Sequence, residues 1–285
     1  MDMTMTESSI RYEQPAPRVA RIVLARPDTR NAQDTKMLYE LNAAFDRAAQ
    51  DDSIHVIILA ADGPHFSSGH YLGEKDAAGA MNQHQTVGTW CGFGCEGAEA
   101  QMAREKEIYI GLSERWRNIP KPTIAEVQGK VIAGGLMLVW PCDLIIAADN
   151  ALFIDNTVAM GISGAEFFNH PWELGARKAK EMLFTSDSVS ANVAEQLGMV
   201  NHVVPLSELQ SATLEIAQRI AEQPLFALKL AKEAVNAAQD NQGRVNAMQT
   251  SFALHQLCHS HNAQLGGGIV HPTFAGRAQE IASRW

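Results

Sequence analysis

Hydrophobic positions along the chain change their spacing at intervals, and these changes predict where strands alternate with helices. Mostly apolar runs occur around residues 19–24, 55–61, 121–129 and 143–149. Short runs without polar alternation are typical of strands that are covered on both faces. Between the first two runs, residues 34–48 carry apolar side chains three or four positions apart, which predicts an amphipathic helix.

The second half of the chain has a different character. From residue 206 to about residue 263, nearly every segment shows helical spacing. The sequence therefore predicts an α/β core over residues 1–205 and a helical region over residues 206–285. Further helices are expected at residues 98–118 and 172–184. Residues 73–100 show little periodicity, and we expect them to form a mobile loop or lid.

The stretch GKVIAGGLMLVWPCD, residues 129–143, raises a separate question, because it has no charge from Val131 to Cys142. This run is too short for a membrane-spanning helix, which needs about 20 residues. We expect a strand that ends near Gly129 and a helix that starts near Ala133. The pair Gly134 and Gly135 then lies in the first turn of that helix, where it serves either tight packing or a close backbone contact with a ligand.

A second bend is predicted at Ser68, Gly69 and His70, where another strand ends. The start of a helix offers N–H groups without an acceptor and a positive dipole end. Two such turns, meeting at one point, can direct two N–H donors at one oxygen atom. The chain thus contains the elements of an oxyanion hole.

Charge and cysteine content exclude several classes of function. The formal net charge is −9 and no Lys/Arg block occurs, which argues against nucleic acid and against an anionic membrane surface. Residues 1–10 are polar and do not resemble a signal peptide, so we expect a cytoplasmic protein. The four cysteines are too few for a disulfide framework in a chain of this length.

Five motifs, in this order, resemble the crotonase (enoyl-CoA hydratase/isomerase) superfamily: RPDTRNAQD, HFSSGHYLGE, KPTIAEVQGKVIAGGLML, CDLIIAADNALF and AEQLGMVNHVV. The resemblance implies a crotonase-type spiral of ββα units with a C-terminal helical segment. It also implies homotrimers or homohexamers, formed through the helical region, which would also cover the active site. The implied substrate is an acyl-CoA, and no cofactor is expected beyond the coenzyme A of that substrate.

The same resemblance assigns residues. The two donors to the thioester oxygen fall on the backbone N–H groups of His70 and Gly134, and the chemistry implied is the stabilisation of an enolate. The coenzyme A contacts fall on Arg26, Arg30, Ala32, His70 and Leu72. Arg30 equally fits an ordinary exposed arginine.

Two positions depart from the family. Hydratases of this family place a glutamate three residues after the oxyanion glycine and a second one in the next turn, and here these positions hold Met137 and Thr157. Both are expected to face the substrate, but neither side chain can replace a carboxylate in acid–base catalysis. The ordinary two-glutamate hydration is therefore in doubt.

Three other residues are candidates for the proton chemistry. Glu166 lies five residues after Gly161, close to where isomerases and C–C hydrolases of the superfamily place a catalytic aspartate, and an apolar pocket would raise its pKa. Glu166 otherwise serves as a helix-start glutamate. His170 either orients Glu166 or caps the helix, and Asp155 either faces the ligand or stabilises a turn. The imidazole of His70 is a further candidate to face the acyl chain.

A metal site is not predicted. On one helix His255, Cys258 and His259 share a face, but His261 points elsewhere and no second ligand cluster is evident. The sequence thus predicts an acyl-CoA hydratase or isomerase that acts through an enolate. Two alternatives remain open: a hydrolase of C–C bonds in β-dicarbonyl compounds, which the departure at residues 166–175 favours, and an acyl-CoA-binding protein without catalytic activity.

Overall fold

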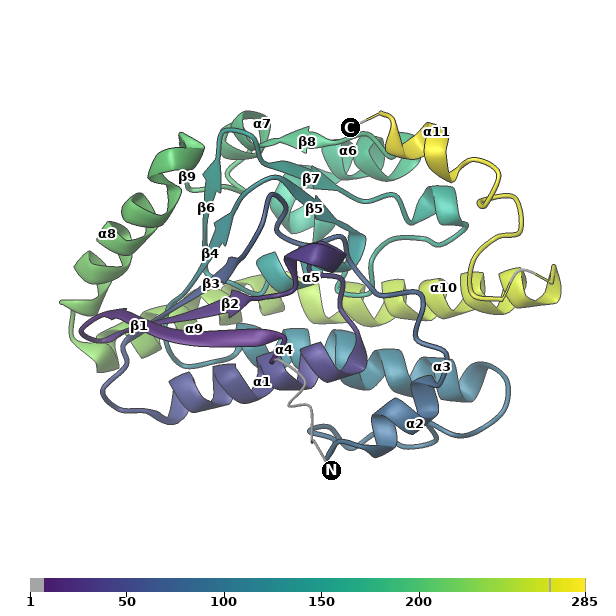
Figure 1. The fold of residues 1–285 in the computed structure, drawn as a ribbon, viewed down its shortest axis with the longest axis horizontal. Helices are drawn as coiled ribbons and strands as arrows, with labels where there is room; N and C mark the ends of the chain where they lie inside the picture. Colours follow the sequence, from purple (N-terminus) through teal and green to yellow (C-terminus); the bar gives the residue numbers. More distant parts are fainter. Residues whose placement is uncertain (1–7, 267, 285) are drawn as a thin grey trace, which may run out of the picture.

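The computed structural model describes residues 8–266 and 268–284, and its main sheet confirms the predicted α/β core (Figure 1). Within these residues the sheet has six strands in the order β1-β2-β3-β4-β6-β9. β1 runs antiparallel to β2, and every other neighbouring pair is parallel. The strands are β1 (Ile10–Ala16), β2 (Val19–Leu24), β3 (Val56–Ala61), β4 (Thr123–Val127), β6 (Leu144–Ala148) and β9 (His202–Val204).

A second, smaller sheet has the order β5-β7-β8 among the described residues. Its strands are β5 (Lys130–Ile132), β7 (Leu152–Ile154) and β8 (Val189–Ser190). β5 follows β4 after two residues and β7 follows β6 after three, so successive units of the chain add one strand to each sheet. This repeated ββα path is the spiral that the sequence predicts.

The two faces of the main sheet are covered by helices that lie far apart in the sequence (Figure 1). Alternate residues of β2 and β3 point to opposite faces, because side chains alternate along a strand. Ile22 and Leu59 join the larger core with α1 (Thr35–Gln50), whereas Val23 and Ile58 join the smaller core with α8 (Leu209–Ala221). The boundary predicted at residue 205 therefore does not separate two cores, since α8 completes one of them.

Helix α1 shows how local sequence sets these elements. Its N-cap is Asp34, whose carboxylate accepts the N–H of Met37, and Leu41 and Phe45 follow on the buried face.

The helix predicted at residues 98–118 is also present, but it contains a π-helical segment. It consists of α3 (Ala98–Glu105), the π-helix Lys106–Gly111 and α4 (Leu112–Arg117). Such π-turns are frequent at functional sites.

The remaining predicted helices differ in detail. α6 (His170–Thr185) begins two residues earlier than expected and is kinked at Gly175, where φ is 71°. The apolar stretch at residues 129–143 is less helical than expected. It contains β5, the 3-10 helix Ala133–Gly135 and a single turn, α5 (Leu136–Val139). Ser190 caps α7 (Ala191–Gln196).

The segment at residues 73–97, expected to be irregular, contains a short helix and is attached to the core. The helix is α2 (Ala77–Asn82). The buried carboxylate of Glu107 accepts the N–H groups of Val87 and Gly88 at 2.6 and 3.0 Å, and the hydroxyl of Tyr39 at 3.1 Å. The segment thus has more regular structure than its lack of periodicity indicates, and its role as a mobile lid stays a prediction.

The C-terminal region consists, after α8, of α9 (Leu225–Asn241), α10 (Arg244–Gln264) and α11 (Ala278–Ala282). Within the described ranges, no helix is both long enough and apolar enough to cross a bilayer. Residues 1–7, the first part of the polar stretch at residues 1–10, lie outside the described residues.

An ion pair fixes α10 to α4. The guanidinium of Arg244, of which 1% is exposed, donates to both carboxylate oxygens of Glu114 at 2.7 and 2.9 Å and to Asp240 at 2.7 Å. Bidentate pairs of this kind are among the stronger charge-assisted contacts in proteins.

We expect Arg244→Gln to lower the free energy of unfolding by about 2 kcal/mol. Loss of one partner leaves uncompensated charge behind, and the partial exposure of Glu114 and Asp240 reduces the cost below that of a fully buried pair. Urea denaturation measures the change. The control is Arg277→Gln, which removes an exposed pair with Glu280 and should change stability by less than about 0.5 kcal/mol. Equal effects of the two substitutions would contradict this role of Arg244.

Candidate active site

A cavity of about 280 Å³ lies where the two predicted turns meet. Its wall is formed by the turn at residues 68–72, the turn at residues 132–134, the segment from α3 to the π-helix, the loop at residues 156–166, α10 and the C-terminal segment. The lining residues of the polar part are Glu74, Gln101, Arg104, Glu105, Tyr109, Asn156, Thr157, Glu166, His255 and His259. Residues from the predicted α/β core (1–205) and from the predicted helical region (206–285) thus form one site.

The first turn, at residues 68–72, points the N–H of His70 away from the segment that contains Gln33. Gln33 and His70 form a parallel bridge, in which the N–H of Gln33 donates to the carbonyl of Gly69 at 2.9 Å and the N–H of Tyr71 donates to the carbonyl of Gln33 at 2.8 Å. In a parallel bridge the residue between these two partners turns its own N–H to the opposite side. The N–H of His70 therefore points away from Gln33.

The second turn lies against the first, backbone to backbone. Gly69 has a φ of 88°, and a Cβ at this position would lie 2.7 Å from the carbonyl oxygen of Ile132 and 3.2 Å from the nitrogen of Gly134. Only glycine permits this approach. The side-chain amide of Gln33 joins the two turns, since it donates to Ser67 Oγ at 3.1 Å and to the carbonyl of Gly134 at 2.9 Å.

Backbone strain is present at the same point. Ala133 has a φ of 45°, in the left-handed region that non-glycine residues rarely adopt. Gly134 follows it in the first turn of the 3-10 helix, where N–H groups have no acceptor within the helix. Both residues line the cavity, as does His70. The two N–H groups selected from the sequence are thus brought together.

The imidazole of His70 occupies the space that a side chain at position 134 would fill. A Cβ on Gly134 would lie 2.8 Å or less from three atoms of the ring. The ring also stacks on Tyr109, with 3.7 Å between centroids, and its Nε2 lies 3.1 Å from Glu166 Oε2. The glycine, the tyrosine and the glutamate together fix the orientation of this histidine.

Glu166 is the carboxylate at the centre of the polar wall. Its side chain is 5% exposed, and its second oxygen lies 3.5 Å from His255 Nε2. Burial alone would raise its pKa, but the interactions with His70 and His255 outweigh burial, and the pKa of Glu166 is lowered. The expectation of a raised pKa is therefore wrong, because two histidines surround a carboxylate that the sequence places among apolar residues. Glu166 is thus held in its ionised form.

Asp155 and His170 form a separate buried pair beside the cavity. His170 Nε2 lies 2.7 Å from Asp155 Oδ2, and neither side chain is exposed. Asp155 also accepts the N–H groups of Thr157 at 2.9 Å and Ala165 at 3.0 Å, so its oxygens are occupied. His170 thus orients Asp155 rather than Glu166, and Asp155 stabilises the turn instead of facing the ligand.

Three residues expected to contact the substrate lie elsewhere. Arg26 forms an ion pair with Asp34, and the side chain of Ala32 is buried. The side chain of Met137 is 2% exposed and packs in the larger core. None of the three residues lines the described cavity, and their contact with the substrate stays a prediction.

The other expected contacts do reach the cavity or its surroundings. Leu72 and Thr157 line it. Arg30 lies in an adjoining cavity of about 170 Å³, together with His65 and Lys130, and this cavity shares Ser68 and Ile132 with the first one. A group of basic side chains is thus found next to the site in a chain of negative net charge.

Sequence reasoning missed Glu105, Tyr109, His255 and His259 as parts of the site. Glu105 directly precedes the π-helix and Tyr109 lies within it, and hydrophobic spacing does not distinguish a π-helix from an ordinary helix. The spacing of His255 and His259, four residues apart on one helix, was the available signal. Glu105, which lies beside these two histidines, precedes His255 by 150 residues in the sequence. Only the fold brings it next to them.

Comparisons with known proteins agree on one family. Residues 15–270 match the model of the family described as "Enoyl-CoA hydratase/isomerase". The chain is 44% identical to "Putative enoyl-CoA hydratase EchA13" of Mycobacterium tuberculosis, over 91% of this chain and 83% of that protein. It is 34% identical to "Enoyl-CoA hydratase domain-containing protein 3, mitochondrial" of Homo sapiens, over 74% of this chain and 66% of that protein.

The solved structures confirm the predicted fold. The crystal structure of a probable enoyl-CoA hydratase from Mycobacterium smegmatis superimposes with a TM-score of 0.82 at 45% identity, over 92% of this chain and 99% of that one. The α/β spiral followed by C-terminal helices is thus the crotonase fold.

We expect Gly134→Ala to displace the imidazole of His70 and to separate it from Glu166. The added methyl group meets the ring directly, whereas the backbone of Gly134 accepts alanine because its φ is not positive. A crystal structure of the variant measures the distance from His70 Nε2 to Glu166. The control is Gly94→Ala, where a Cβ meets no atom within 4 Å among the described residues. An unmoved imidazole in the Gly134 variant would show that the glycine does not determine this geometry.

Proposed function

The chain belongs to the enoyl-CoA hydratase/isomerase family, whose enzymes act on acyl-CoA, and we propose that it catalyses proton transfer through the enolate of an acyl-CoA thioester. In this proposal the backbone N–H groups of His70 and Gly134 donate to the thioester oxygen. Glu166 removes the proton from the carbon next to the thioester. The observation that carries the proposal is the meeting of these three groups on one cavity wall.

The backbone geometry supports the two donors. The N–H of His70 is directed away from Gln33, and Gly134 lies in the first turn of a helix, at the point where the two turns touch. Fixed donors stabilise charge that develops on an oxygen without needing to reorganise, and the loss of one donor typically costs about 2.7–4 kcal/mol of transition-state stabilisation. The hole would therefore favour the enolate over the neutral thioester.

The charge of Glu166 supports its role as the base. The carboxylate takes the proton from the α-carbon, and the electron pair of the broken C–H bond moves onto the thioester oxygen. The same residue can return the proton to the α-carbon or, in an isomerisation, deliver it to the γ-carbon. His70 acts as a positioning residue, because its Nε2 holds one carboxylate oxygen at 3.1 Å.

One carboxylate at the reacting carbon favours isomerisation over ordinary hydration. The two positions where hydratases of the family hold glutamates are Met137, which packs in the core, and Thr157, whose hydroxyl donates to Asp155 at 2.5 Å. Hydration requires one group to activate water and another to protonate the α-carbon, whereas a 1,3 proton shift requires one group only. We therefore place an enoyl-CoA isomerisation first among the reactions of this family.

The adjoining basic cavity supports recognition of coenzyme A. Arg30, His65 and Lys130 line it, and phosphate groups bind preferentially to such side chains. A ligand whose acyl end lies in the first cavity can extend its phosphates into the second, since the two share Ser68 and Ile132.

The exposed face of α9 supports assembly into homotrimers or homohexamers. No residue of this helix is buried, and Phe226, Leu230 and Val235 are exposed by 72%, 49% and 63%. Large exposed apolar side chains on one helix are typical of subunit interfaces.

We expect Glu166→Gln to lower the turnover of an enoyl-CoA isomerisation by at least about 100-fold and to leave acyl-CoA binding within about threefold. The substitution removes the base but keeps the size of the side chain. Turnover is measured with 3-enoyl-CoA substrates, and binding by calorimetry with a saturated acyl-CoA. The control is Glu181→Gln, an exposed glutamate of α6 outside the cavity. Unchanged turnover in the Glu166 variant, or cleavage of a cyclic β-diketone with no activity on any acyl-CoA, would contradict the proposal.

A further inference from the structure

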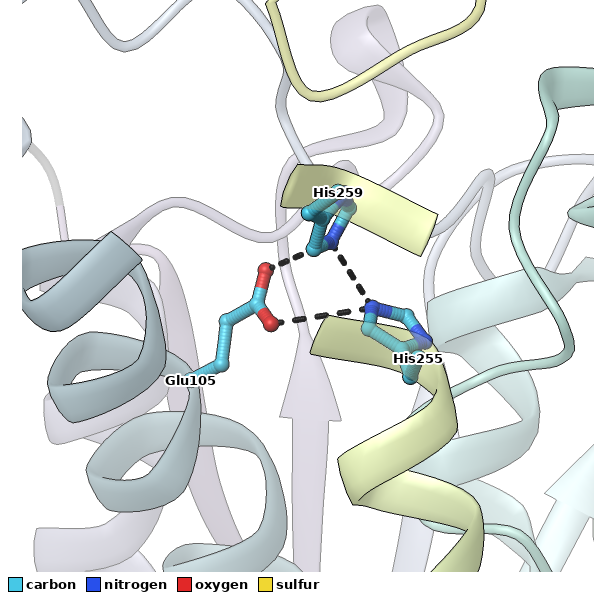
Figure 2. A group of neighbouring side chains, drawn as sticks. All are labelled: Glu105, His255 and His259. Carbon is cyan, nitrogen blue, oxygen red and sulfur yellow. Dashed lines mark hydrogen bonds and ion pairs between the residues drawn. The ribbon is translucent and has the colours of Figure 1, made fainter. Parts of the chain in front are cut away.

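Three side chains outside the proposed proton transfer converge on one point at the edge of the cavity. They are Glu105 at the end of α3 and His255 and His259 on α10 (Figure 2). Their ligand atoms all lie within 4.8 Å of one another, and all three side chains are at least nine-tenths buried. In the sequence, His255 and His259 lack a second group of ligands nearby. Glu105, from a distant helix, supplies it.

The hydrogen bonds of the two histidines determine which ring nitrogen is protonated. His255 Nδ1 lies 2.7 Å from the carbonyl oxygen of Gly164, and His259 Nδ1 lies 2.7 Å from that of Ile269. A carbonyl oxygen only accepts hydrogen bonds, so both Nδ1 atoms carry the proton. In the neutral rings both Nε2 atoms then present a lone pair, which is the form of histidine that binds metals.

These lone pairs face each other and a carboxylate. The two Nε2 atoms are 2.8 Å apart, and they lie 3.2 Å (His259) and 3.6 Å (His255) from the carboxylate oxygens of Glu105 (Figure 2). These electron-rich atoms repel one another at such distances unless a cation lies between them, either a metal ion or a proton on one Nε2. At metal–ligand distances of 2.0–2.2 Å, neighbouring ligand atoms are separated by about 3.0 Å in octahedral and about 3.4 Å in tetrahedral sites. The observed separations cover this range.

The surroundings orient all three ligands. The side-chain amides of Gln101 and Gln256 each donate to one oxygen of Glu105, and each oxygen keeps a second lone pair for an ion. The histidines are fixed by the carbonyls of Gly164 and Ile269. Hydrogen bonds of this kind to the far side of each ligand are a regular feature of metal sites in proteins.

We propose that Glu105, His255 and His259 bind one divalent transition-metal ion. Two imidazoles and one carboxylate are the donor set of zinc and of neighbouring first-row ions. The three ligands line the same cavity as Glu166 and Gly134, so the remaining coordination positions are open to water or to an oxygen of a ligand in the cavity. The proposal rests on the cluster itself and does not depend on the acyl-CoA reaction.

Zinc binding to the full-length protein, purified without a histidine tag and dialysed against EDTA, tests the proposal. Calorimetric titration with ZnCl₂ should show one saturable site per chain, and the Tm should rise with the zinc concentration because the ion binds the folded state. A cobalt titration should give visible absorption of four- or five-coordinate Co²⁺. No saturable binding of either ion would overturn the proposal and would leave a shared proton as the cation.

Substitutions locate the site. His255→Gln, His259→Gln and Glu105→Gln should each weaken zinc binding by at least about 100-fold, because each removes one of three ligands. The matched control is His261→Gln, which removes an exposed histidine of the same helix and should leave the affinity within twofold. Circular dichroism verifies that each variant is folded. Results from two folded ligand variants are enough to locate the site. Zinc affinity that is unchanged in the folded ligand variants, or lost equally in the control, would overturn the assignment.

Discussion

The close contact between the two backbone turns is the constraint on which the site depends. Gly69 and Gly134 permit the contact because they lack side chains, and the amide of Gln33 holds it by bonding to both turns. The missing side chain of Gly134 also makes the space for the imidazole of His70. One glycine thus serves the backbone donors and the position of the histidine that orients Glu166. The strain at Ala133 is located at this contact, where the rest of the fold can stabilise it.

Four strands of the main sheet, most helices and the positions of the two backbone turns could be predicted from the sequence, because each depends on local spacing or on a short motif. The apolar runs correspond to β2, β3, β4 and β6, and the glycine motifs locate the two turns. The burial of Met137 and Ala32 could not be predicted, because the direction of each side chain depends on how a short helix or turn packs against the rest of the fold. The lowered pKa of Glu166 was equally out of reach, because it depends on histidines that lie 96 residues before it and 89 residues after it.

The polar wall of the cavity is a continuous network rather than a single catalytic residue. Glu166 joins His70 to His255, and His255 joins Glu166 to His259 and Glu105. Buried networks of this kind are stable only when each member has a partner. Helix α10 supplies His255 and His259 to this buried network, whereas the N–H donors of His70 and Gly134 belong to the α/β core. The helical region is therefore needed to complete the site.

In the proposed function, a thioester oxygen binds between the N–H groups of His70 and Gly134, with Glu166 beside the α-carbon. A crystal structure with a saturated acyl-CoA bound tests this claim most directly. We predict that the oxygen lies about 2.7–3.1 Å from both nitrogen atoms and that a carboxylate oxygen of Glu166 is the nearest base to the α-carbon. A thioester bound away from the two turns, or an α-carbon out of reach of Glu166, would contradict the account.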